Sequence, residues 1–257
     1  MSKIVAISCS KVATPALSNK KITKNLIGTF NADKELVKLC GKKRPTLLFI
    51  PTASLDSADY VGCISRYFNI IFGCKIQVLY LTAGRYSHKE ARDKILKADI
   101  IYVGGGDTLK MMHLWRKYGI DKLLCLAAGK NTVLAGVSAG GICWFDGGNS
   151  DSRRKNNPQA GLIKVQGLGF IKAIFSPHYK SDASRKAHLK RILRHDSRVA
   201  IATDDYCAIE IIDDKFKIIK NNNKSNIYKV YWKNKKFFHE RLANDKGYLP
   251  LEMLLKK

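Results

Sequence analysis

The sequence predicts an α/β fold built on a mostly parallel, doubly wound sheet. Short apolar runs that are typical of buried strands alternate with segments of helical periodicity up to about residue 195. Polar or glycine-rich residues directly follow three of these runs, beginning at Pro51, Gly104 and Ser138. In such sheets ligands bind beyond the carboxyl ends of the strands. We therefore expect these three loops to lie at one edge of the sheet.

The elements of this alternating part follow from the periodicity of apolar residues. Strands are expected at Ile4–Ser8, Thr46–Ile50, Ile76–Leu81, Ile100–Val103, Thr132–Val137 and Ala173–Phe175. Helices are expected within 19–40 after an initial loop, and at 57–72, 87–97, after Thr108 and at 181–195. Ser87 is suited to cap the third of these helices, because its side-chain oxygen can accept a hydrogen bond from the first turn.

Two regions depart from the alternation. Residues 146–169 are rich in Gly, Asn, Ser and Lys, and we expect a long loop there, with room for a short hairpin. From Val199 onward the chain is β-rich, with hairpin turns expected at Asp213-Asp214 and Asn221–Asn223. Strands are expected there at Val199–Ala202, Cys207–Ile212, Phe216–Ile219, Ile227–Trp232 and Lys236–His239. We expect one domain of residues 1–257, with a core of about 1–212 and a β-rich C-terminal extension of about 213–257.

Composition narrows the class of protein. The 257 residues are 46% hydrophobic, which suffices for a sizeable core, but no apolar run reaches the roughly 18 residues of a membrane span. The N-terminal run reads as a buried strand rather than a secretory signal. Seven scattered cysteines without a Cys-x-x-Cys pair favour reduced thiols in a cytoplasmic protein.

The formal net charge of +25 raises the question of a nucleic-acid partner. The Lys and Arg residues are spread along the chain, with some enrichment after residue 214, and no tight basic block interleaves with aromatic residues. We therefore do not expect nucleic acid as the main partner. A preference for acidic ligands fits this distribution better.

The most informative motif is Gly-x-Ser-x-Gly at Gly136–Gly140. An apolar run precedes it and a helix-compatible run (Ile142–Phe145) follows, which is the strand–turn–helix context of a nucleophile elbow. The glycines are needed because a side chain there would collide with a neighbouring strand or helix. Ser138 is therefore the candidate nucleophile, with a structural glycine turn as the alternative.

A serine hydroxyl needs a base within hydrogen-bond reach, and that base needs an orienting acid. Of six histidines, His178 alone follows a predicted strand end directly, behind Pro177, and is the candidate base. Asp151, thirteen residues after Ser138, is the favoured acid. Asp205, which follows the predicted strand Val199–Ala202, is the alternative acid.

The oxyanion of acyl transfer is usually held by two backbone donors. The N–H of Ala139, directly after the nucleophile, is the first candidate. The second is expected in the glycine loop Gly104–Thr108, with Gly106 favoured. A phosphate-binding role for this loop is the weaker alternative, because no Gly-Lys-Ser/Thr follows and the spacing is not Gly-x-Gly-x-x-Gly.

Three motifs in combination resemble the aspartyl dipeptidase (peptidase E) and cyanophycinase group of serine peptidases. They are GGGDT at 104–108, GVSAG at 136–140 and SPHY at 176–179, and PTAS at 51–54 also resembles that group. The similarity spans about residues 1–212. It implies a flavodoxin-like fold akin to class I glutamine amidotransferases, with Ser138 as nucleophile and His178 as base. It does not choose between Asp151 and Asp205.

We expect a serine hydrolase, specifically a small-peptide peptidase. In this interpretation residues 146–160 shape the pocket, Arg153, Arg154 and Lys155 can bind a substrate carboxylate, and Asp107 contacts substrate, although the family often has Asn there. No cofactor or metal is expected, and the protein would be a monomer or homodimer. Two alternatives stay open. One is an α/β-hydrolase-type esterase with His239 as base. The other is a non-catalytic module that binds anions or nucleic acid.

Overall fold

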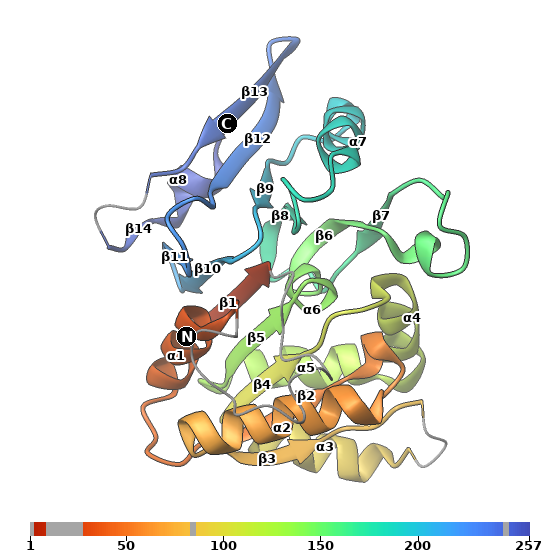
Figure 1. Ribbon diagram of the computed structural model, residues 1–257, viewed down its shortest axis with the longest axis vertical. Helices are drawn as coiled ribbons and strands as arrows, with labels where there is room; N and C mark the ends of the chain where they lie inside the picture. The colour runs from red at the N-terminus through yellow and green to blue at the C-terminus, as the bar shows by residue number, and fades with distance from the viewer. Residues whose placement is uncertain (1–2, 9–27, 83–85, 244–246) are drawn as a thin grey trace.

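The computed structural model describes residues 3–8, 28–82, 86–243 and 247–257, and within them the strands form two sheets (Figure 1). The first has eight strands in the order β14-β11-β10-β1-β5-β4-β2-β3, and the second has six in the order β13-β12-β9-β8-β6-β7. The expected α/β class is confirmed. The expectation of one sheet is wrong, because the chain leaves the first sheet after β5 and starts a second one at β6.

The first sheet has a parallel half and an antiparallel half. Its parallel strands are β1 (Lys3–Ser8), β2 (Thr46–Ile50), β3 (Lys75–Val78), β4 (Ile100–Val103) and β5 (Val133–Val137). Its antiparallel strands are β10 (Cys207–Ile212), β11 (Lys215–Lys220) and β14 (Leu249–Pro250). Because β10 pairs with β1 along its whole length, one part of the late β-rich region (β10, β11 and β14) completes the first sheet.

The second sheet has a parallel centre with antiparallel edges. It contains β6 (Phe145–Ser150), β7 (Ile163–Gln166), β8 (Ile171–Ser176), β9 (Ala200–Thr203), β12 (Ile227–Lys233) and β13 (Lys236–Arg241). Strand β8 lies between β6 and β9 and runs parallel to both. This arrangement brings the carboxyl ends of three parallel strands together.

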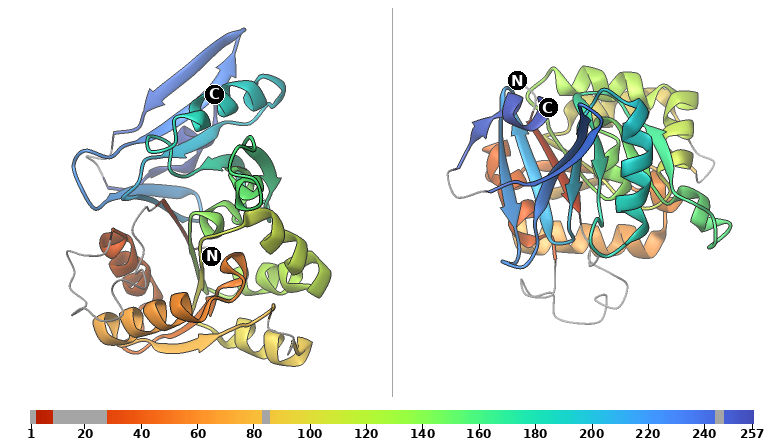
Figure 2. Two further views of the ribbon diagram at one scale, coloured as in Figure 1. Left: turned by 45° about the vertical axis from the view of Figure 1, so that its right-hand side comes forward. Right: turned by 90° about the horizontal axis from the view of Figure 1, so that it is seen from above.

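Helices cover the first sheet on both faces, as its uniformly apolar strands require. One face packs against α1 (Phe30–Cys40) and α2 (Ala58–Phe72). The other packs against α3 (His88–Lys97), α4 (Thr108–Tyr118) and α5 (Ile120–Ala128). Figure 2 shows the same layering from two further directions. Ser87 caps α3 by accepting a hydrogen bond from the Glu90 N–H, as the sequence predicts.

The remaining helices are short and lie near strand ends. They are α6 (Ala139–Ile142), α7 (Ser184–Ile192), α8 (Leu251–Leu255) and the 3₁₀ turns η3 (Thr52–Ser54), η4 (Ser152–Lys155) and η5 (Leu193–His195). Helix α7 packs on the second sheet. Among the described residues, no helix is both long enough and apolar enough to cross a membrane.

Three local expectations need correction. The helix after Ser138 ends at Ile142, because Phe145 already begins β6. Residues 146–169 contain the expected short hairpin, the antiparallel pair of β6 and β7, but the rest is less of a loop than expected because η4 lies between these strands. The turn at Asn221–Asn223 does not close a hairpin, because it carries the chain from β11 in the first sheet to β12 in the second. By contrast, Asp213-Asp214 does close the β10–β11 hairpin.

Candidate active site

Ser138 occupies a strained turn between β5 and α6. Its φ of 54° and ψ of −109° lie outside the regions that L-residues ordinarily adopt, and its N–H donates to the Ile7 carbonyl of neighbouring β1 at 2.9 Å. Such strain persists only where the surrounding structure imposes it, and it concentrates at functional sites. The turn leaves Ser138 half-buried at the carboxyl end of β5, as a nucleophile elbow requires.

The glycines beside Ser138 allow the backbones to approach each other closely. A Cβ on Gly140 would come within 2.2 Å of the Val103 carbonyl oxygen of β4, and one on Gly136 within 2.2 Å of the Gly140 oxygen. Both distances are far below van der Waals contact. The sharp turn that presents Ser138 therefore requires glycine at both positions.

His178 joins Ser138 to Asp205 through its two ring nitrogens. Its Nε2 lies 2.9 Å from the Ser138 Oγ, and its Nδ1 lies 2.6 Å from Asp205 Oδ1. A carboxylate needs a donor, so the proton belongs on Nδ1, and Nε2 is then free to accept from the serine hydroxyl. Ser138 follows β5 of the first sheet, and His178 and Asp205 follow β8 and β9 of the second. The site therefore lies where the carboxyl ends of parallel strands from the two sheets meet.

The Asp205 carboxylate is held in its ionised form. Burial raises its pKa, but hydrogen bonds from His178 and Ser181 and the positive field of Arg185 outweigh that effect and lower the pKa overall. Arg185 is a buried residue of α7, and no sequence pattern singled it out. An ionised Asp205 can fix the imidazole in one tautomer and stabilise its protonated form.

Asp151, the favoured acid, is not a hydrogen-bond partner of the His178 ring. Both ring nitrogens of His178 are already engaged, by Ser138 and Asp205. Asp151 instead begins the η4 turn, where its backbone carbonyl accepts from the Arg154 N–H at 2.8 Å. Asp151 follows β6 and Asp205 follows β9, and these two strands flank β8 on opposite sides. Each aspartate therefore follows a strand that ends next to β8. The Asp151 charge acts instead on Arg185: burial lowers the pKa of that guanidinium, and the carboxylates of Asp151, Asp182 and Asp205 partly offset the effect.

The loop after β4 passes beside the nucleophile. A Cβ built on Gly105 would be 3.4 Å from the Ser138 Cβ, and Gly106, at φ 142°, packs so tightly that a Cβ would overlap the Ala53 carbonyl oxygen. The N–H groups of Gly106 and Ala139 have no acceptor among the described residues. Both expected oxyanion donors are therefore near Ser138. Asp107, by contrast, caps α4 by accepting from the Lys110 N–H at 3.0 Å.

The basic residues of η4 divide into a structural and an exposed group. Arg154 donates to Asp182 at 2.9 Å, to Ser184 at 2.8 Å and to the Ala160 carbonyl at 3.1 Å. These bonds tie η4 to the start of α7. Arg153 is exposed and makes no such contact with the described residues, so of these two arginines it is the one free to meet a ligand.

His239 and the cysteines lie outside the Ser138–His178–Asp205 series. His239, the base required by the esterase alternative, stacks on Tyr228 with ring centres 4.4 Å apart and so lies in an aromatic stack on β12 and β13. Within the described ranges no group of three or more His, Cys, Asp or Glu side chains could hold a metal ion. The six cysteines of those ranges are free thiols, and Cys9 lies outside them.

A mixed α/β fold that holds a serine, a histidine and a carboxylate in hydrogen-bonded series at parallel strand ends has the architecture of a hydrolase. The chain belongs to peptidase family S51, whose family model matches residues 17–219. It is 30% identical over 200 residues to an uncharacterized peptidase, YgaJ, of Bacillus subtilis (strain 168), covering 77% of this chain and 83% of the relative.

Solved structures share the fold. A peptidase from an acI-B1 Actinobacterium superposes with a TM-score of 0.65 at 17% identity, covering 97% of both chains. A putative peptidase E protein from Listeria monocytogenes EGD-e gives a TM-score of 0.61 at 19% identity, covering 86% of this chain and 100% of the other. The resemblance to peptidase E seen in the sequence motifs is thus confirmed at the level of the family.

Proposed function

We propose that this protein is a serine peptidase that cleaves small peptides through an acyl-enzyme on Ser138. The observation that carries the proposal is the position of the His178 ring, 2.9 Å from the Ser138 Oγ and 2.6 Å from the Asp205 carboxylate. A nucleophile, its base and the base's orienting acid then stand in one series. Asp205 takes the role for which the sequence favoured Asp151.

The reaction follows from this geometry. His178 Nε2 accepts the hydroxyl proton as Ser138 Oγ bonds to the scissile carbonyl carbon. The same proton then passes to the leaving amine as the C–N bond breaks, and an ester on Ser138 remains. Water, deprotonated by His178, hydrolyses that ester and restores the serine. Asp205 stabilises the imidazolium in both halves of the cycle.

The oxyanion is assigned to the backbone N–H groups of Ala139 and Gly106. Ala139 begins α6 directly after the nucleophile, and Gly106 belongs to the loop that contacts Ser138. Each such donor contributes on the order of 3 kcal/mol to transition-state stabilisation. The tight packing of Gly106 against Ala53 fixes this loop in place, so the donor is oriented before substrate arrives.

Small peptides are the substrates that the surroundings favour. The α4 N-terminus contacts both η3 and η4, and the Leu109 N–H donates to the Ser152 hydroxyl at 3.0 Å, which ties η4 to the glycine loop. Segments fixed around the nucleophile in this way limit the length of chain that can enter. Arg153, exposed on η4, is the candidate for binding a substrate carboxylate.

A fluorophosphonate probe tests the nucleophile directly. We expect labelling of the wild-type protein, loss of labelling in Ser138→Ala and strong reduction in His178→Ala. His239→Ala is the matched control, because the esterase alternative requires that histidine and the present proposal does not. Labelling or cleavage that survives Ser138→Ala would reject the proposal. Mass spectrometry then follows cleavage of a dipeptide and tripeptide library and, in parallel, of simple esters. Cleavage of the peptides distinguishes a peptidase from an esterase.

A further inference from the structure

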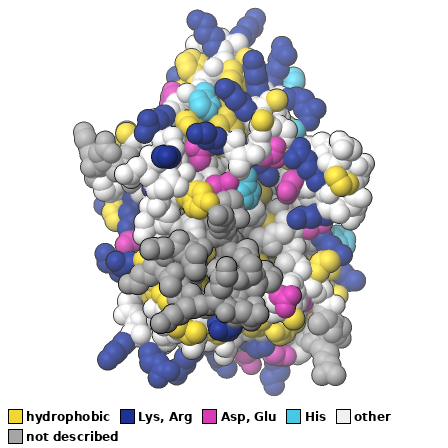
Figure 3. Space-filling model, viewed as in Figure 1, with side chains coloured by type: hydrophobic (Ala, Val, Ile, Leu, Met, Phe, Trp, Pro, Cys, Tyr) yellow, Lys and Arg dark blue, Asp and Glu magenta, His cyan; other side chains and the backbone are white. Residues whose placement is uncertain are grey.

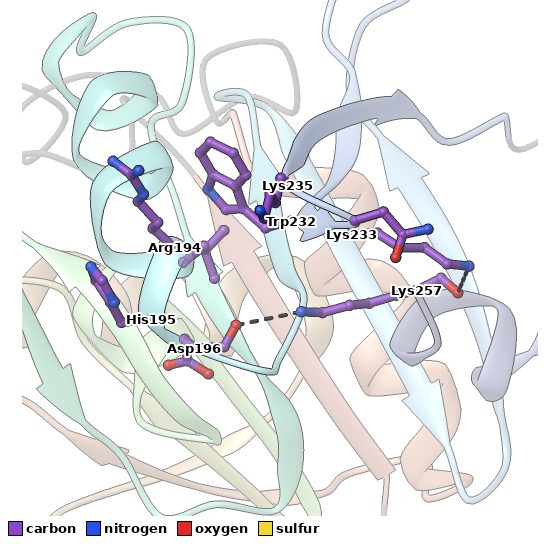
Figure 4. A pocket seen from close by; sticks show the side chains of 9 residues that line it. Arg194, His195, Asp196, Trp232, Lys233, Lys235 and Lys257 are labelled. Atoms are coloured by element: carbon purple, nitrogen blue, oxygen red, sulfur yellow. Dashed lines mark hydrogen bonds between the residues drawn. The ribbon is translucent and has the colours of Figure 1, made fainter.

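A second, strongly basic pocket lies away from the candidate active site. It has a volume of about 530 Å³ and lies between η5 and the β12–β13 hairpin (Figure 4). Asp196 of this pocket precedes β9, whereas Asp205 of the active site follows it. The pocket is therefore at the opposite end of that strand, and a ligand there would not occupy the position of a substrate on Ser138.

The pocket is lined by four cationic side chains, of which Lys233 donates to the Lys257 carbonyl at 3.2 Å and Lys257 donates to the Asp196 carbonyl at 3.4 Å. Arg194, Lys233, Lys235 and Lys257 line it, and none of them forms an ion pair within the part of the chain that the structure describes. Its one acidic residue, Asp196, is neutralised from outside the pocket. Arg198 and Lys164 each lie 2.6 Å from that carboxylate, and their contacts hold its pKa well below the usual range. The pocket as a whole thus favours an anion.

An aromatic ring forms one wall of the same pocket. The Trp232 indole N–H donates to the Lys190 carbonyl at 2.9 Å, which fixes the ring, and the Arg194 guanidinium lies 6.0 Å from its centre. Trp232 is partly exposed, whereas Trp115 and Trp144 are fully buried. Figure 4 shows Arg194 and Lys235 on either side of the Trp232 side chain. The ring, Arg194 and Lys235 thus line the same hollow, whereas the Lys233 ammonium points toward the Lys257 carbonyl.

We propose that this pocket binds a nucleotide, with its phosphates on the Arg194, Lys233, Lys235 and Lys257 side chains and its base against Trp232. Its volume lies in the range of small-molecule sites. Guanidinium and ammonium groups are the usual partners of phosphate, and aromatic side chains stack on bases of every sequence. Trp232 also packs against Phe237, with ring centres 5.5 Å apart, so a base would stack on the part of the indole that stays exposed, whereas a carboxylate ligand would use the cations alone.

The nucleotide can be free or part of a single strand, and the surrounding surface bears on that choice. Figure 3 shows Lys and Arg side chains gathered at the end of the molecule that carries the β12–β13 hairpin and α7. Lys190 and Arg191 of α7 and Lys236 of β13 are exposed in this region. A basic surface that continues beyond the pocket suits the backbone of a longer strand.

Intrinsic tryptophan fluorescence tests this site, because Trp232 is the one tryptophan that a ligand can reach. The full-length protein is titrated with ATP, a short oligoadenylate, inorganic tripolyphosphate and poly-glutamate at about 150 mM salt. We expect both adenine ligands to quench the fluorescence. The double variant Lys233→Glu/Lys235→Glu should weaken their binding by at least about tenfold. Tighter binding of the oligonucleotide than of ATP would identify a strand as the ligand, and equal binding would identify a free nucleotide.

Two controls make the result decisive. Lys89→Glu/Lys122→Glu changes the net charge equally on the exposed faces of α3 and α5, and it should bind like wild type. Fluorophosphonate labelling of each variant, unchanged from wild type, shows that folding and the active site are intact. The proposal is overturned if neither adenine ligand binds, if the control variant weakens binding as much as the pocket variant, or if poly-glutamate or tripolyphosphate binds and quenches as well as ATP.

Discussion

The side-chain hydroxyl of Ser8 accepts a hydrogen bond from the backbone N–H of His178 at 2.8 Å. The same hydroxyl donates to the Thr203 carbonyl at 3.2 Å, two residues before Asp205. Ser8 is fully buried at the end of β1, a strand of the first sheet, whereas His178 follows β8 and Thr203 ends β9, both strands of the second. One serine thus fixes the histidine loop and the aspartate loop to each other and to the sheet that carries Ser138.

We predict that Ser8→Ala slows labelling of Ser138 by about tenfold while the fold persists, because the buried His178 N–H loses its partner, which costs on the order of 1–3 kcal/mol. Labelling rate and thermal unfolding are measured together. Ser87→Ala, which removes the α3 cap, is the control, with a comparable loss of stability and an unchanged labelling rate. Equal labelling rates in Ser8→Ala and wild type would contradict a positioning role.

Asp205→Asn should lower peptide cleavage by about a hundredfold to ten-thousandfold, because an amide at this point favours the wrong tautomer of His178. Asp151→Asn should change cleavage by less than about threefold, since its carboxyl group does not contact the imidazole. Steady-state cleavage of one peptide by both variants checks this. If Asp151→Asn proves the more damaging, the assignment of the acid is wrong.

Gly140→Ala should prevent the native turn at Ser138 from forming. The added methyl would overlap the Val103 carbonyl, and relief requires β4 and α6 to separate, at a cost on the order of 3 kcal/mol. Gly161→Ala is the matched substitution, because its Cβ would meet nothing within 4 Å. Urea unfolding should show a large loss for the first variant and little change for the second. Similar midpoints for the two would refute the packing argument.

His188 should make stability depend on pH. Burial, together with Arg191 and Arg185, lowers its pKa from 6.5 to about 4, and its Nδ1 lies 2.8 Å from Asn149 Oδ1. The unfolded state therefore protonates His188 more readily than the folded state does. The contribution of the neutral His188 to the free energy of unfolding is complete above pH 6.5 and is lost as the pH falls toward 4. At about pH 5 the loss should be on the order of 1–2 kcal/mol.

The measurement is the free energy of unfolding in urea at about pH 7.5 and pH 5 for wild type and His188→Gln, whose side chain does not titrate. The variant should lose less stability between the two pH values than wild type does. His195→Gln, at an exposed position, is the control and should follow wild type. Parallel pH profiles for wild type and His188→Gln would disprove the role of this histidine.

Arg153→Ala should raise KM for peptides with an acidic side chain by about fivefold to tenfold and leave neutral peptides unaffected, because one charge-assisted contact is lost. Arg154→Ala should behave differently. Its bonds to Asp182 and Ser184 tie η4 to α7, so the substitution should lower the free energy of unfolding. Its effect on cleavage should be the same for acidic and neutral peptides. Kinetics with a matched pair of acidic and neutral peptides distinguish these outcomes. An unchanged preference in Arg153→Ala would remove this residue from the substrate site.

The sequence predicted those features that depend on local pattern. Apolar runs and glycines placed β1, β2, β4 and β5 nearly to the residue, and Gly136–Gly140 identified the turn at Ser138 from spacing alone. His178 followed from its position after a strand end. Each of these inferences rests on neighbouring residues, whose geometry the chain itself imposes through strand, turn and helix preferences.

What the sequence could not decide is how distant strands meet. Nothing local announces that the chain starts a second sheet at Phe145, that β10 returns to pair with β1, or that β8 lies between β6 and β9. Those pairings make Asp205, rather than Asp151, the neighbour of His178, and they bury Ser8 beneath both loops. Contacts between segments far apart in sequence depend on which strands become neighbours in a sheet. Only the tertiary structure could therefore choose between two aspartates that both follow strands beside β8.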